Sequence, residues 1–305
     1  MAKINISAVV NTRNEEKNLE GCLKSLQFAD EIIVVDMEST DNTKNVAKSF
    51  TDKVFDTEMV GFVEPARNIA ISKAVGNWIL IIDADERVPK TLAKRLIEVT
   101  QENNADFVRI PRKNIIFGQW TQHSRWWPDY NIRFFKKGSV EWQNEIHSIP
   151  VTTGVGINLD LEETLAIEHF HYSSIDEYFE RALRYSTQQA KELINSGYKF
   201  DPKDLIGKPL SEFMSRFFAG DGYKDGLHGL VLAFLQMFSV MLIYLKVWQH
   251  EGHEPKKAGF FTPIWQNIFI EKFKELRYWY LTVLIQQEPK KAKRFLLKLS
   301  RKLSK

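Results

Sequence analysis

The sequence contains a single cysteine, Cys22, and this scarcity excludes an internal disulfide framework. We expect Cys22 to pack in the core, because it lies on the apolar side of a predicted helix. The sequence also lacks a Ser/His/Asp nucleophile set, a Cys/His zinc spacing and a Walker-type glycine loop. No signal-peptide pattern precedes the first predicted strand, so we expect a cytoplasmic protein.

Charge is distributed unevenly along the 305 residues, of which 44% are hydrophobic and 27% charged. This composition is typical of a globular protein with one large or two medium domains. Residues 288–305 carry a net charge of +7, so the other 287 residues contribute −4 to the total of +3. A mildly acidic body with a basic tail argues against nucleic acid as a partner.

Apolar strand-like runs alternate with helical patterns in the first hundred residues. We predict strands near residues 4–10, 31–36, 54–55 and 79–83, separated by segments with apolar residues at helical spacing. This alternation is typical of an α/β fold with a parallel sheet and right-handed crossovers. Polar residues follow each strand, and in such sheets ligands bind at the carboxyl edge.

The most informative of these strand ends is Asp83-Ala84-Asp85-Glu86, which follows the buried run Ile79–Ile82. Two carboxylates spaced one residue apart at this edge suit a hard divalent cation that also holds phosphate oxygens. The alternative interpretation of residues 79–86 is a strand end followed by an acidic turn before the helix that begins at Pro89.

Four groups of residues, in order and at the right spacing, resemble glycosyltransferase family 2 over residues 4–250. They are Asn14-Glu15-Glu16, Asp36 with Ser39-Thr40-Asp41, Arg67-Asn68, and Trp78 through Asp83-Ala84-Asp85-Glu86. Within that family the sequence looks most like the lipopolysaccharide core β-1,4-glucosyltransferase-like group. The residues shared with that group are Trp126-Trp127-Pro128-Asp129, Arg133-Phe134-Phe135 and Asp225-Gly226.

The resemblance implies a GT-A (Rossmann-like) mixed sheet flanked by helices and a metal-dependent, inverting hexosyltransferase that uses a nucleotide-sugar donor. It implies that Asp83 and Asp85 position a divalent cation, Mg²⁺ or Mn²⁺, on the diphosphate. Asp36 would accept hydrogen bonds from a uracil or ribose, which favours a UDP-linked donor. The full set of expected donor-binding residues is Thr12, Arg13, Asn14, Glu15, Asp36, Glu38, Arg67, Asn68, Ala84 and Arg133.

The acceptor side and the catalytic base are expected in residues 106–170, where alternating runs at 107–110 and 132–135 predict added antiparallel strands. Trp126 and Trp127 are expected to form an acceptor cleft, because aromatic planes favour sugar rings; core packing is the alternative. Glu145 is the first candidate for the base and Asp129 the second. Many members of the family carry a glutamate where this sequence has Ser148, directly after His147, so His147 also stays a candidate.

The remainder of the chain is predicted to be helical. A capping box at Ser174 begins a long helix to about Ser196, and residues 198–209, with two prolines, predict a loop before a short helix at 213–218. Residues 227–248 are apolar and long enough to cross a membrane, although we prefer a helix in the interface. From Pro289 onward, apolar residues line one face of a basic helix, which favours peripheral attachment to an anionic membrane surface.

We therefore predict three regions: a catalytic GT-A domain (1–172), a helical region completing the acceptor side (173–249) and basic amphipathic helices (250–305). The predicted function is transfer of a sugar to a lipid-linked glycan or lipopolysaccharide core acceptor at the inner face of the cytoplasmic membrane. A nucleotidyltransferase and a non-catalytic membrane-surface binding protein on the same fold are the alternatives. Oligomeric state stays open.

Overall fold

The computed structural model describes residues 5–58, 64–142, 150–253 and 261–302, which divide into two compact units. The first unit comprises residues 1–120 and 127–171, and the second comprises residues 121–126 and 172–305. The chain therefore enters the second unit for six residues, returns to the first, and leaves it again after His171. Each unit is described by itself below.

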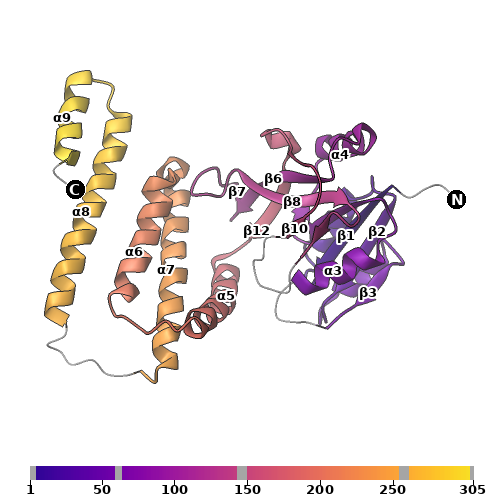
Figure 1. Ribbon diagram of the computed structural model, residues 1–305, viewed down its shortest axis with the longest axis horizontal. Helices are drawn as coiled ribbons and strands as arrows, with labels where there is room; N and C mark the ends of the chain where they lie inside the picture. Colours follow the sequence, from indigo (N-terminus) through magenta and orange to yellow (C-terminus); the bar gives the residue numbers. More distant parts are fainter. Residues whose placement is uncertain (1–4, 59–63, 143–149, 254–260, 303–305) are drawn as a thin grey trace. The chain divides into compact units, whose positions relative to one another are not determined.

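The first unit is built on a mixed sheet (Figure 1). Its strand order is β3-β2-β1-β4-β8-β6-β12-β5. The neighbours β3, β2, β1 and β4 are parallel, whereas β4 pairs with β8 and β8 with β6 in antiparallel fashion. The strands are β1 Ile6–Thr12, β2 Glu31–Asp36, β3 Val54–Asp56, β4 Trp78–Asp83, β5 Glu86–Arg87, β6 Phe107–Ile116, β7 Gln119–Trp120, β8 Asp129–Lys136, β9 Val140–Glu141, β10 Val151–Thr152, β11 Gly156–Asn158 and β12 Ile167–Tyr172. The expected parallel strands and added antiparallel strands are confirmed.

Helices cover both faces of this sheet because its central strands are apolar on both sides. Leu80 and Ile82 of β4 pack in one core cluster, and Ile79 and Ile81 pack in another on the opposite face. The helices are α1 Leu19–Ser25, α2 Thr43–Lys48, α3 Glu64–Lys73 and α4 Lys90–Glu102, with a short 3₁₀ turn at Glu163–Leu165. Cys22 of α1 is fully buried in the first cluster, and burial raises the pKa of its thiol, so it packs in the core as expected.

The second unit is helical. Its elements are α5 Ile175–Asn195, α6 Asp204–Met214, a π-helical turn Ser215–Ala219, a 3₁₀ turn Gly222–Asp225, α7 Gly226–His250, α8 Phe261–Gln287 and α9 Lys291–Lys302. The side chain of Ser174 accepts a hydrogen bond from the backbone of Glu177 at 3.1 Å, which confirms the cap that begins α5. The helices α8 and α9 lie side by side (Figure 1).

The predicted loop at 198–209 is wrong in its second half, because α6 begins at Asp204 and contains Pro209. Proline inside a helix lacks the N–H that would bond to the preceding turn. Here the ring of Pro209 is buried, and Phe213 of the same helix packs on Phe234 of α7 with ring centroids 4.8 Å apart. Apolar packing of α6 therefore outweighs the lost hydrogen bond, and the predicted helix at 213–218 is the end of α6 and its π-helical turn.

Residues 121–126 are held in the second unit by specific polar contacts. The backbone N–H of Ser124 donates to the carbonyl of Gly220 at 2.7 Å, and the Ser124 hydroxyl donates to the carbonyl of Arg216 at 2.7 Å. His123 contacts Asp225 at 2.6 Å through Nδ1. We name this six-residue segment the crossing segment.

One helical stretch of the described chain, Gly222–His250, is long and apolar enough to cross a membrane. Only 22% of its most apolar window is buried inside the protein. Length and composition therefore permit a membrane span without demonstrating one.

Candidate active site

The carboxyl edge of β1, β2 and β4 presents buried polar side chains whose hydrogen-bonding capacity is partly unused. Asn11 pairs in register with Asp83, and Thr12 pairs with Asp36. The Asn11 amide, the Thr12 hydroxyl and Asp36 Oδ1 have no hydrogen-bond partner among the described residues. Buried polar atoms without partners are costly, so an edge that gathers them is suited to a polar ligand.

The loops above this edge are tied to each other. The backbone N–H of Asn14 donates to the Ser39 hydroxyl at 2.8 Å, and the Asn14 amide oxygen accepts from the Thr40 backbone at 2.8 Å. Asn14 and Glu38 both have a positive φ, which fits turns at these positions. Asparagine is a common helix cap, so the sequence also predicts a helix beginning at Asn14; this is wrong, because a turn follows Asn14 and α1 begins only at Leu19. Arg13 and Glu38 are exposed beside these turns.

Asp83, the last residue of β4, is bound by two arginines. Arg133 Nη2 lies 2.6 Å from Asp83 Oδ2, and Arg67 Nη2 lies 3.0 Å from Asp83 Oδ1. Burial alone would raise the pKa of Asp83, but the charges of Arg133 and Arg67 outweigh it and hold that pKa well below its usual range. Arg133 Nη2 also donates to Glu86 Oε1 at 2.8 Å. Asp83 is therefore an ionised partner of these guanidinium groups.

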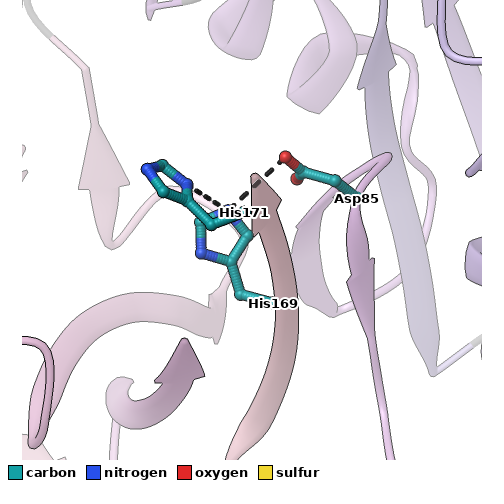
Figure 2. Close-up of side chains that lie close together, drawn as sticks. All are labelled: Asp85, His169 and His171. Carbon is teal, nitrogen blue, oxygen red and sulfur yellow. Dashed lines mark hydrogen bonds and ion pairs between the residues drawn. The ribbon is translucent and has the colours of Figure 1, made fainter. Parts of the chain in front are cut away.

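Asp85 has different partners and points toward two histidines of β12 (Figure 2). Asp85 Oδ2 lies 3.4 Å from His169 Nε2, which in turn lies 3.0 Å from His171 Nδ1. The antiparallel pairing of β12 with β5 produces this approach, since His169 is in register with Glu86. Ligand atoms of the three residues lie within 4.8 Å of one another.

This cluster fits a divalent cation. Atoms that bind a common ion at about 2.1 Å lie about 3 to 4.2 Å from each other, and the Asp85–His169 and His169–His171 distances of 3.4 and 3.0 Å fall in this range. A carboxylate oxygen and a ring nitrogen that face each other need a proton or a cation between them. Two imidazoles beside one carboxylate favour a first-row transition ion such as Mn²⁺ over Mg²⁺. The geometry is thus compatible with the predicted metal-binding role of Asp85. The same role of Asp83 stays a prediction, because the side chain of Asp83 forms ion pairs with Arg67 and Arg133.

Asp129 at the start of β8 is enclosed by hydrogen-bond donors. Arg112 Nη2 lies 2.7 Å from Asp129 Oδ2, and the Asn114 amide nitrogen lies 3.2 Å from the same oxygen. Burial raises the pKa of Asp129, but the neighbouring Arg112 charge more than offsets this and leaves it below its usual value. A carboxylate held in this way is a weak general base.

The two other candidate bases, Glu145 and His147, lie outside the described residues. The chain just before them is fixed by Asn68, whose side-chain amide donates to the Trp142 carbonyl at 2.7 Å and accepts from the Trp142 N–H at 3.1 Å. Asn68 thus holds the backbone that leads to residues 143–149. The donor-binding role predicted for it, and for the buried Ala84, stays a prediction.

The two tryptophans predicted for an acceptor cleft belong to different units. Trp127 stands edge-on to Trp120 in the first unit with ring centroids 5.3 Å apart. Trp126 belongs to the crossing segment and lies under the guanidinium of Arg216, 5.6 Å from the ring centroid. Both rings are only partly buried, so neither is purely a core residue.

Sequence reasoning missed the roles of His169, His171 and Asn114 in this cluster. A signal was present: histidines two residues apart in a strand project from the same face. Asn114 gave no comparable signal, since its partners His169 and Asp129 are 55 and 15 residues away.

The chain matches a family model and curated proteins. The profile of glycosyl transferase family 2 matches residues 7–163. An uncharacterized glycosyltransferase of Rickettsia typhi is 31% identical over 253 residues, which cover 79% of this chain and 86% of that protein. A lipopolysaccharide core biosynthesis glycosyltransferase, LpsC, of Rhizobium meliloti is 27% identical over 260 residues, covering 82% of this chain and 94% of its own length.

Solved structures are similar at a lower level. Residues 1–349 of S. aureus TarS in complex with UDP share 14% identity, with a TM-score of 0.42 over 83% of this chain and 93% of that chain. Glucosyl-3-phosphoglycerate synthase from Mycobacterium tuberculosis shares 23% identity, with a TM-score of 0.31 over 35% of this chain and 43% of that chain.

Proposed function

Because the chain belongs to glycosyl transferase family 2, we propose that it transfers a sugar, with inversion, from a UDP-linked donor to a lipid-linked glycan or lipopolysaccharide core acceptor. One observation carries the proposal: Asp85, His169 and His171 converge beside a sheet edge whose polar atoms lack partners. The edge suits the nucleotide, and the cluster suits a cation on its diphosphate. The printed name of the Rhizobium meliloti relative supports the lipopolysaccharide acceptor.

The nucleotide would be held by the edge of β1 and β2. Asp36 Oδ2 already accepts from the Ser39 backbone at 2.9 Å, which leaves Oδ1 to accept an N–H of uracil or a ribose hydroxyl. Asn11 offers both a donor and an acceptor, and Thr12 offers a hydroxyl. These groups orient the base and ribose, and place the diphosphate toward the end of β4.

The leaving group would be stabilised at the end of β4. Asp85, His169 and His171 would hold a divalent cation, which supplies Lewis-acid stabilisation of the leaving diphosphate. Arg67 Nε has no hydrogen-bond partner among the described residues, so this guanidinium can donate to a phosphate oxygen while Asp83 holds its other end. Arg133 is buried and keeps Asp83 oriented.

The acceptor hydroxyl needs a base on the face opposite the diphosphate. Glu145 stays the first candidate, and His147 also stays a candidate. The enclosure of Asp129 by Arg112 and Asn114 disfavours it for this task.

We also propose that the second unit attaches to an anionic membrane surface. Among the side chains of α9, Phe295 is 62% and Leu296 64% exposed, and basic residues surround them. On α8, Phe269 and Phe273 are also more than 60% exposed. Exposed aromatic and aliphatic side chains beside a basic face are typical of helices that lie in the headgroup region. A lipid-borne acceptor would then be met at the surface where it resides.

The experiment that tests the donor site is calorimetric titration of UDP, GDP and CDP, with and without Mn²⁺, into the wild type and Asp85→Ala. We expect metal-dependent binding of UDP that is lost in the variant. The matched control is Asp52→Ala, an exposed carboxylate before β3 at the opposite edge of the sheet. Absence of metal-dependent binding of every nucleotide would contradict the proposal, and turnover by Asp85→Ala at the wild-type rate would show that the cluster is not needed.

A further inference from the structure

A buried hydrogen-bonded chain connects Asp129 to His169 through Asn114. Asn114 lies in β6 and is 1% exposed. Its amide nitrogen lies 3.2 Å from Asp129 Oδ2, and its amide oxygen lies 2.6 Å from His169 Nδ1. We propose that Asn114 and Asp129 are positioning residues that fix the ring tautomer of His169 for metal binding, an inference that rests on the metal site of the proposed function.

The direction of the Asn114 amide follows from its neighbour. An ionised carboxylate only accepts hydrogen bonds, so the amide nitrogen of Asn114 must face Asp129. The reversed amide would place its carbonyl oxygen against the carboxylate. Asp129 is itself held by Arg112, whose Nε and Nη2 lie 2.8 and 2.7 Å from Asp129 Oδ2, and by the Asn131 amide at 3.0 Å from Oδ1.

The orientation of the amide then decides which nitrogen of His169 carries the proton. The amide oxygen of Asn114 can only accept, so His169 Nδ1 must donate to it. In the neutral ring this leaves the lone pair on Nε2, the atom that faces Asp85 Oδ2 and His171 Nδ1. Metal-binding histidines generally have their second nitrogen fixed in this way. Asp129 thus acts on the metal site through Asn114 and not on the acceptor.

Asp129 could act as the catalytic base or as a positioning residue, and a loss of activity in an Asp129 variant would not distinguish these two roles. A catalytic base would be needed for turnover and not for metal binding. A positioning residue would be needed for metal binding, and turnover would follow metal occupancy. The affinity of the full-length, metal-free protein for Mn²⁺, measured by electron paramagnetic resonance, is therefore the primary readout.

We expect Asn114→Leu to raise the Kd for Mn²⁺ by about 10- to 100-fold, the range seen when the outer partner of a metal ligand is lost. Asp129→Asn should raise the Kd for Mn²⁺ by about 10-fold, the lower end of this range. The new amide oxygen can still accept from Asn114, but an amide no longer forces the Asn114 nitrogen to face it. The matched control is Asn131→Ala, which removes one hydrogen bond to Asp129 and leaves the Asn114–His169 contact in place. It should change the Kd by less than about 3-fold.

A swapped pair gives a second, independent test. In Asn114→Asp the new carboxylate would face Asp129, and metal binding should weaken. Adding Asp129→Asn restores a donor opposite that carboxylate, which can again accept from His169 Nδ1. We expect the double variant to recover both Mn²⁺ affinity and turnover, and histidine-selective ¹⁵N NMR of the metal-free protein should show the Nδ1–H tautomer in the wild type and the double variant.

Two results would overturn the inference. One is Mn²⁺ binding by Asn114→Leu within about 3-fold of the wild type. The other is loss of turnover in Asp129→Asn, or in the double variant, with Mn²⁺ affinity unchanged, which would identify Asp129 as the base. Failure of the wild type itself to bind Mn²⁺ would instead contradict the proposed function, so the two failures are distinguishable.

Discussion

Arg133 is the residue whose loss should destabilise the first unit most clearly. Its side chain is only 4% exposed, and its Nη2 donates to Asp83 and Glu86 at 2.6 and 2.8 Å. Replacing it in Arg133→Met keeps much of the volume but leaves the buried Glu86 and the partly exposed Asp83 without their shared cation. Removing one partner of a buried ion pair costs about 3–5 kcal/mol.

The lower end of that range applies here, because Glu86 keeps two donors. Arg112 lies 3.3 Å from Glu86 Oε1, and the Asp83 backbone N–H lies 2.9 Å from Oε2. We therefore expect a loss of about 3 kcal/mol. For a unit of this size, each kcal/mol lowers Tm by about 2–4 °C, so the expected shift is about 6–12 °C.

The assay is thermal unfolding of the full chain followed by circular dichroism, with Lys24→Met as control. Lys24 forms a helical surface pair with Glu20, both more than half exposed, so its loss should leave Tm within experimental error. Adding Glu86→Gln to Arg133→Met should recover part of the loss, with a coupling free energy of about 0.5–3 kcal/mol. A shift for Arg133→Met no larger than that of the control would refute the reasoning.

Three further predictions concern other parts of the chain. Burial raises the pKa of Glu31, but hydrogen bonds from Lys53, Ser7 and the Val75 backbone outweigh burial, so the pKa lies below its usual value. The difference in unfolding free energy between wild type and Glu31→Gln, measured by urea unfolding, should therefore be constant above about pH 5 and shrink below about pH 4. A Cβ on Gly229 would lie 1.9 Å from the Gly222 carbonyl oxygen, so Gly229→Ala should lower the stability of the second unit by about 1–3 kcal/mol in the same assay. Replacing three basic residues of α9 by glutamine should weaken co-sedimentation with anionic vesicles by about 3 kcal/mol, or about 150-fold, and leave the weak binding to neutral vesicles unchanged. The three residues are Lys291, Lys298 and Lys302.

The central strands were predictable from the sequence because their signal is local. Ile79–Ile82 is a continuous apolar run, and the structure buries its alternate residues on opposite faces of β4. Where the prediction failed, a non-local contact decided the outcome. Packing around Pro209 made a helix from an expected loop, and contacts between two loops gave Asn14 a role other than capping.

The candidate site was predictable in part for the same reason. Asp83 and Asp85 follow a strong strand signal, so their place at the carboxyl edge could be inferred. It could not be inferred that Asp83 pairs with arginines and Asp85 with histidines, because Arg133 and His169 lie 50 and 84 residues later in the chain. The antiparallel pairing of β12 with β5 brings His169 to Asp85, and no local pattern specifies that register.

The crossing segment has a consequence for how such a chain can evolve. Since residues 121–126 belong to the second unit, three peptide connections join the two units: 120–121, 126–127 and 171–172. A recombination event that exchanged everything after residue 171 would bring a new helical unit without the matching six residues. Ser124 would then lose the Gly220 and Arg216 carbonyls, and His123 would lose Asp225. The helical unit therefore cannot be exchanged by a single recombination event without losing these contacts, and we expect the two units to be inherited together.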